Sequence, residues 1–98
     1  MQVEVVRRGG LIGLPMRGSF DTGQLPEPAA SRATRALREL PFGKPPAAPT
    51  HPDSFQYEIT VMDAGERRQV VVDESQLPSD LRSLVDGALR RRLQDDRL

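Results

Sequence analysis

The sequence predicts an α+β domain in which one four-stranded antiparallel sheet has two helices packed on one face. Three observations lead to this prediction. Strand-like runs occur in two separate parts of the chain, and a helix-like amphipathic stretch follows each of them. The motif D-x-x-Q-L-P occurs twice, in 21–26 and 73–78, each time between the strand pattern and the helix pattern. The chain of 98 residues is long enough for one domain, so residues 1–98 are expected to form a single unit with the order ββα-ββα.

The first half begins with a short β-branched run at 2–8, and the glycine pair at 9–10 permits a tight turn after it. Residues 11–21 predict the returning strand. Because Pro15 has no N–H to donate to a neighbouring strand, we expect an edge strand that is irregular after Leu14.

A helix is predicted over 27–40 by an apolar stripe at helical spacing, formed by Ala29, Ala33, Ala36, Leu37 and Leu40. The next segment, 41–54, contains five prolines among its 14 residues, which excludes regular structure and predicts a loop.

The second half repeats this plan. A strand is predicted over 55–62, with its inward face formed by Phe55, Tyr57, Ile59 and Val61. A turn at 63–66 and a partner strand at 67–73 follow.

The second helix, predicted over 79–94, has the most regular periodicity in the chain, with a stripe formed by Leu81, Leu84, Val85, Ala88 and Leu89. Because Arg92 would fall at the centre of this stripe, its buried part should end near Leu89. Residues 94–98 are expected to fray.

The repeated motif is interpreted as a strand-to-helix corner. In each copy the aspartate should end the strand and accept free amides, the leucine should anchor the corner in the core, and the proline should fix the backbone at helix entry. These residues are Asp21, Leu25 and Pro26 in the first copy and Asp73, Leu77 and Pro78 in the second. We interpret the two halves as copies of one ββα unit that arose by duplication. The alternative is that the two Leu-Pro helix starts are independent of each other.

Composition excludes several classes of function. Fourteen Lys and Arg balance fourteen Asp and Glu, so no overall field attracts nucleic acid or an anionic membrane. The absence of cysteine excludes disulfides and thiolate chemistry and is compatible with an intracellular protein. The N-terminal apolar run is too short for a signal peptide, and no stretch reaches membrane-spanning length. We therefore expect a soluble, cytoplasmic protein that binds neither nucleic acid nor membrane.

Catalysis and metal binding are not expected either. The only histidine, His51, lies in the proline-rich segment, and a zinc site requires three or four suitable ligands. A solvated loop histidine is the simpler interpretation. No nucleotide-binding loop or strained nucleophile turn is present, so the sequence favours a binding protein without a cofactor.

The chain resembles the emfourin family through three features in a fixed order: VEVVRRGGLIGL in 3–14, FQYEITVMDAGERRQVVVD in 55–73 and LPSDLRSLV in 77–85. The resemblance implies a small, non-enzymatic inhibitor of bacterial M4 zinc metallopeptidases of the thermolysin and protealysin type. It also implies a monomer that forms a 1:1 complex by occluding the active-site cleft.

M4 peptidases favour a bulky apolar residue just after the cut bond, so the expected contact is the first hairpin tip, Gly9, Gly10, Leu11 and Ile12. The second tip, Ala64, Gly65, Glu66 and Arg67, is a candidate partner loop. Either tip could instead be a plain β-turn, and Leu11 and Ile12 could belong to the core.

Two rival interpretations remain. One is a non-catalytic binding or scaffold module with another bacterial protein partner. The other is a nucleic-acid-associated domain, which would require its arginines to gather on one face: Arg7, Arg8, Arg67, Arg68 and Arg90–Arg92.

Overall fold

Four strands and two helices follow one another in the predicted order. The computed structural model describes the backbone of residues 1–10, 13–46 and 48–95, and side chains as far as residue 90. The first half consists of β1 (Gln2–Gly9), β2 (Met16–Asp21) and α1 (Ala29–Arg38), and the second of β3 (Phe55–Asp63), β4 (Glu66–Asp73) and α2 (Ser79–Asp95). The α+β fold class is therefore confirmed.

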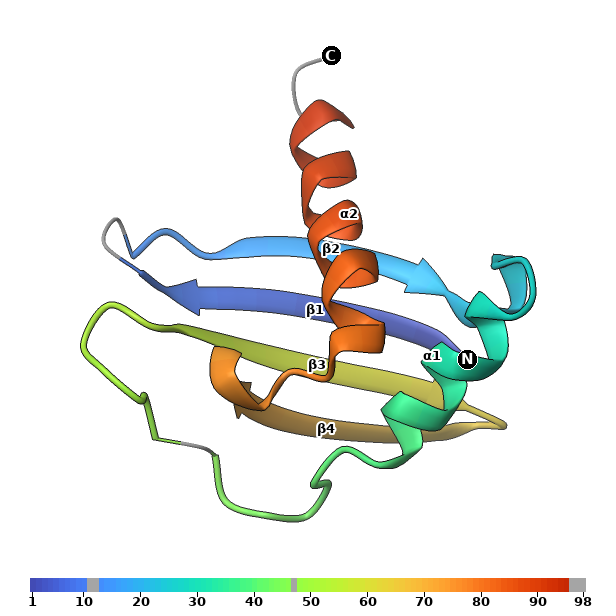
Figure 1. Ribbon diagram of the computed structural model, residues 1–98, viewed down its shortest axis with the longest axis horizontal. Coiled ribbons are helices and arrows are strands. Elements are labelled where there is room, and N and C mark those ends of the chain that lie inside the picture. The colour runs from blue at the N-terminus through green and yellow to red at the C-terminus, as the bar shows by residue number, and fades with distance from the viewer. Residues whose placement is uncertain (11–12, 47, 96–98) are drawn as a thin grey trace.

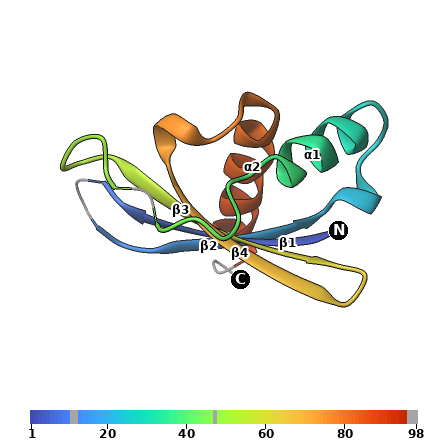
Figure 2. The ribbon, with the colours of Figure 1, turned by 90° about the horizontal axis from the view of Figure 1, so that it is seen from below.

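The strands form one antiparallel sheet in the order β2-β1-β3-β4. The two halves of the chain meet where β1 pairs with β3, in a register that runs from Gln2 opposite Met62 to Gly9 opposite Phe55. Both helices lie on the same face of the sheet, and α2 crosses above the central strands (Figures 1 and 2). Strand β2 is an edge strand, as Pro15 predicts.

The core lies between this face of the sheet and the two helices. Its buried strand residues are Val3, Val5, Phe20, Tyr57, Ile59, Val61, Val70 and Val72, and its buried helix residues are Ala33, Ala36, Leu37, Leu81, Val85, Ala88 and Leu89. Leu84 and Phe55, which were expected in the core, are only partly buried and pack at its margin. Their burial is partial because they lie at the edges of the stripes to which they belong.

The first hairpin does not close in a tight turn at the glycine pair. Strand β1 ends at Gly9 and β2 begins only at Met16, so a six-residue connection, 10–15, joins them. Pro15 has no N–H for the ladder, which explains why the strand starts after it rather than at residue 11. Leu11 and Ile12 lie outside the described residues.

Each D-x-x-Q-L-P copy forms a short 3-10 turn between strand and helix, η1 (Thr22–Gln24) and η2 (Glu74–Gln76). The aspartates cap these turns as predicted: Asp21 accepts the Gly23 N–H at 2.8 Å and Asp73 accepts the Ser75 N–H at 3.0 Å. Leu77 is buried, whereas Leu25 is only partly buried against the core.

The helix ends differ from the prediction in both halves. Helix α1 begins at Ala29 rather than 27, because Pro28 disfavours a helical conformation at the residue before it. Helix α2 continues to Asp95, one residue beyond the predicted end, and no glycine or proline interrupts its last turns. None of the helices in the described ranges is both long and apolar enough to cross a membrane.

Candidate functional site

The two hairpin tips lie at opposite ends of the sheet. Gly9, at the end of β1, is opposite Phe55, whereas the β3–β4 turn follows Met62, which is opposite Gln2 at the start of β1 (Figure 1). The structure therefore does not bring Gly9 and Gly10 together with the second tip, and each tip would contact a partner separately.

At one end, the β3–β4 turn is short, exposed and charged. Ala64 and Gly65 both have positive φ, 50° and 81°, which matches the right-handed twist of a two-residue hairpin. Glu66 and Arg67 are exposed, and Glu66 forms an ion pair with Arg68 at 3.1 Å.

At the other end, the start of the β1–β2 connection is held against the residues that precede β3. Gly10 donates its N–H to the Ser54 carbonyl oxygen, with a nitrogen–oxygen distance of 3.4 Å. Gly10 has φ +78°, and a Cβ built on it would lie 2.5 Å from the Phe55 ring. Any other residue here would have both an unfavourable φ and a steric clash.

The Phe55 ring is also held by Arg7. The guanidinium carbon of Arg7 lies 4.3 Å from the ring centroid, a cation–π contact. The same guanidinium contacts the Met16 sulfur at 2.8 Å. Phe55 and Arg7 therefore link the first residue of the connection, Gly10, to the first residue of β2.

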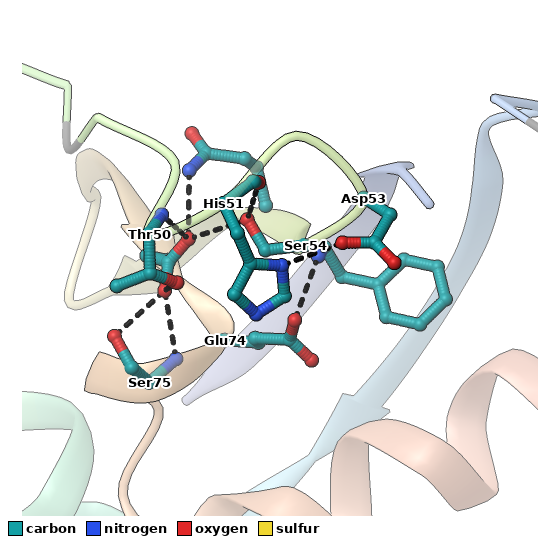
Figure 3. A network of polar contacts seen from close by, with 9 residues as sticks. Thr50, His51, Asp53, Ser54, Glu74 and Ser75 are labelled. Atoms are coloured by element: carbon teal, nitrogen blue, oxygen red, sulfur yellow. Dashed lines mark hydrogen bonds and ion pairs between the residues drawn. The ribbon is translucent and has the colours of Figure 1, made fainter. Parts of the chain in front are cut away.

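The segment that holds Gly10 is fixed in turn by the carboxylate of Asp73, at the end of β4. Figure 3 shows the surrounding network, in which Thr50, Ser54, Glu74 and Ser75 are labelled. Asp73 accepts hydrogen bonds from the Thr50 N–H and hydroxyl, at 3.2 and 2.8 Å, and from the Ser54 hydroxyl at 3.0 Å. Gln56 donates at 3.2 Å, and the Ser75 N–H and hydroxyl donate at 3.0 and 2.6 Å. These donors, with Ser75 first, hold the pKa of Asp73 far below its usual range.

Neighbouring contacts complete this network. Glu74 accepts the Phe55 N–H at 3.2 Å. His51 is exposed, as expected for a loop histidine, and its Nδ1 lies 2.6 Å from an Asp53 carboxylate oxygen. The hydrogen bond to His51 lowers the pKa of Asp53. We call the residues Thr50–Phe55, together with Asp73 and Glu74, the clasp.

The clasp distinguishes the two copies of the motif. Asp21 occupies the same position in the first copy, but its one side-chain hydrogen bond with the described residues comes from Gly23. Asp73 makes the equivalent bond to Ser75 and additionally holds Thr50 and Ser54. The sequence predicted the capping role of both aspartates but not this second role.

One apolar residue of the β1–β2 connection, which the sequence did not single out as a contact, is largely exposed. Leu14 has 70% of its surface exposed, and Met62, at 45%, is the other large hydrophobic residue found exposed among the described residues. From the sequence, Pro15 was interpreted only as a strand signal, and Leu14 was not identified as a residue that could contact a partner.

The described arginines do not gather on one face. Arg7 and Arg8 are consecutive residues of one strand, as are Arg67 and Arg68, so each pair is divided between the two faces of the sheet. Arg7 and Arg68 lie at opposite ends of the helix-covered face. Residues 1–10, 13–46 and 48–90 also contain no group of three acidic or histidine side chains placed to hold a metal ion.

A comparison with protein-family models gives a match to the model described as Emfourin over residues 5–89. The chain belongs to the Emfourin family. The matched range includes β1 from Val5 on, β2, the second hairpin, the clasp and α2 as far as the buried Leu89. Neither the curated proteins nor the solved structures include a match to the chain. Emfourin membership supports a protease-inhibitor role, with a protein as the partner and no catalytic activity of its own.

Proposed function

We propose that this emfourin is an inhibitor of a bacterial M4 zinc metallopeptidase and that it occludes the active-site cleft of its target inside the cell. The family match over residues 5–89 is the observation on which the proposal depends. M4 peptidases hold zinc on a His-Glu-x-x-His helix within a cleft and prefer a bulky apolar residue after the cut bond. An inhibitor without metal ligands can block such a cleft by placing a fixed apolar loop in it.

The β1–β2 connection is the better candidate for the loop that enters. Its first residue, Gly10, is held by Ser54 and Phe55, and the strand at its other end begins at Met16, which contacts Arg7. Such anchoring reduces the entropy that binding costs. The β3–β4 turn, Ala64 and Gly65, is instead followed by the exposed charged residues Glu66 and Arg67, which an apolar pocket would have to desolvate.

The first experiment is a titration of a purified thermolysin-like M4 peptidase with the purified protein. We expect competitive inhibition that reaches completion at one inhibitor per peptidase, and mass spectrometry should show the inhibitor uncut. A serine peptidase serves as the control and should keep its full activity. If the M4 peptidase retains its activity at a large excess of the protein, the proposal is wrong and a binding module for another partner becomes the better interpretation.

A second experiment distinguishes the two ends of the sheet. Gly10→Val would force a β-branched side chain into the Phe55 ring at positive φ, so it should weaken inhibition if the β1–β2 connection enters the cleft. Leu11→Asp should weaken it as well in that case, because a charged side chain would be carried into the apolar cleft without a partner. Arg67→Ala, in the other tip, is the matched control and should leave inhibition unchanged. The reverse pattern in folded variants would assign the contact to the β3–β4 turn.

A further inference from the structure

Leu14 lies in the β1–β2 connection with its side chain directed into solvent. A single exposed leucine needs no explanation on its own, because folded proteins expose much apolar surface. Leu14 differs because of its neighbours, Gly13 before it and Pro15 after it. Together they make a short peptide that a peptidase cleft could bind without cutting.

Gly13 has open space on the side where a side chain would lie. It has φ +72°, and a Cβ built at this position would meet no atom within 4 Å outside its chain neighbours. Since glycine carries no side chain there, a partner could approach the connection from that side. A cleft that binds Leu14 in a side-chain pocket could approach the Gly13–Leu14 bond closely.

Pro15 restricts the conformation of Leu14. The proline ring disfavours the helical region for the residue before it, so Leu14 is biased toward an extended backbone. Extended peptides bind by forming main-chain hydrogen bonds with the edge of a site while their side chains enter pockets. Leu14 is therefore biased toward the conformation that such binding requires.

Pro15 also lacks an N–H that an extended peptide could donate to the edge of a site. A peptide that places Leu14 just after the bond to be cut presents the next N–H to the cleft, but Pro15 has none. The segment can bind through its leucine while the Gly13 carbonyl carbon stays displaced from the attacking water. A displacement of roughly 1 Å can slow a reaction by about 100-fold.

We propose that Leu14 is the side chain that enters the apolar pocket of the peptidase, and that Pro15 protects the Gly13–Leu14 bond from hydrolysis. This inference rests on the proposed inhibition of an M4 peptidase. It assigns the contact to Leu14 rather than to a residue of the glycine tip, and it gives Pro15 a role beyond delaying the start of β2.

The test compares Leu14→Ala with Met62→Ala, a change at a second large hydrophobic residue that is exposed in the described part of the chain. Met62 lies at the opposite end of the sheet, where it pairs with Gln2 and Arg67. Loss of a buried leucine side chain from the complex should raise the inhibition constant by about 10- to 100-fold. Met62→Ala should leave it within about twofold of the parent. Thermal melts should show that both variants remain folded, since both side chains are exposed.

Pro15→Ala tests the second part. It restores the missing N–H, so water should add across the Gly13–Leu14 bond, leaving a carboxylate on Gly13 and an amine on Leu14. Mass spectrometry after incubation with the peptidase should detect the fragments 1–13 and 14–98 from this variant and not from the parent. If Pro15→Ala inhibits and stays intact, the protective role of Pro15 is wrong.

The outcomes separate this inference from the proposed function. If the parent inhibits and Leu14→Ala inhibits equally well, the assignment of Leu14 is wrong while the function stands. If the parent does not inhibit any M4 peptidase, the proposed function fails and the roles of Leu14 and Pro15 fail with it.

Discussion

Gly18 is the position at which one methyl group should disturb the fold most directly. It lies in the edge strand β2, opposite Val5 of β1, on the face that α2 covers. A Cβ built on Gly18 would lie 2.6 Å from both the carbonyl carbon and oxygen of Ala88 and 2.9 Å from the Leu89 nitrogen. These are backbone atoms of α2, so no side-chain rotation can relieve the contact.

The cost of Gly18→Ala can be worked out from this geometry. Because contacts below about 3 Å are repulsive, α2 or β2 must shift, and such overpacking costs roughly 1–3 kcal/mol. Replacing glycine also restricts the unfolded chain, which opposes the loss by about 0.4–1 kcal/mol. The net loss should be roughly 1–2 kcal/mol, and for a domain of this size the melting temperature should fall by about 5–15 °C.

Thermal and urea denaturation followed by circular dichroism would measure this loss. Ser19→Ala is the matched control, because Ser19 is the next residue of the same strand and is exposed on the uncovered face. It should melt within about 2 °C of the parent, since surface substitutions usually change stability by less than 0.5 kcal/mol. A Gly18→Ala variant as stable as Ser19→Ala would show that α2 does not cross β2 in this contact.

Three further predictions concern the clasp, the core and metals. Asp73→Asn should lower the melting temperature and increase hydrogen exchange at the Thr50 and Phe55 amides more than Asp21→Asn does. The reason is that Asp73 holds the proline-rich segment through Thr50 and Ser54, whereas Asp21 accepts a hydrogen bond within its own turn. Equal effects of the two substitutions would contradict this role of Asp73. Because folding lowers the pKa of Asp73 from its ordinary 3.8, the ionised carboxylate stabilises the folded protein fully at neutral pH, and this stabilisation is lost on acidification. The difference in melting temperature between Asp73→Asn and the parent should therefore become smaller below about pH 4. Leu81→Ala should cost about 2–5 kcal/mol in chemical denaturation, whereas Leu84→Ala, at a partly buried position, should cost less than about 2 kcal/mol; the reverse order would show that α2 is rotated. A chelator should leave the melting temperature unchanged, and a large fall would reveal a structural metal.

Features that depend on neighbouring residues were predictable from the sequence. A strand has a side-chain period of about 2.0 residues, which places Tyr57, Ile59 and Val61 on one face. A helix has a period of about 3.6 residues, which does the same for Leu81, Val85 and Leu89. The structure buries all six. The D-x-x-Q-L-P motif predicted caps because an aspartate accepts amides within its own turn. These patterns determined the fold class without any long-range information.

Only the tertiary structure decided which distant residues meet. Asp73 joins Thr50 and Ser54 because the proline-rich segment returns beside the end of β4, and no local pattern in that segment predicts its path. The antiparallel pairing of β1 with β3 decided that the two hairpin tips lie at opposite ends of the sheet. The exposure of Leu14 was likewise decided there, since burial depends on what packs against a residue rather than on its type. Local periodicity therefore determined the elements of this protein, while the placement of its candidate contact surface depended on packing between segments far apart in the chain.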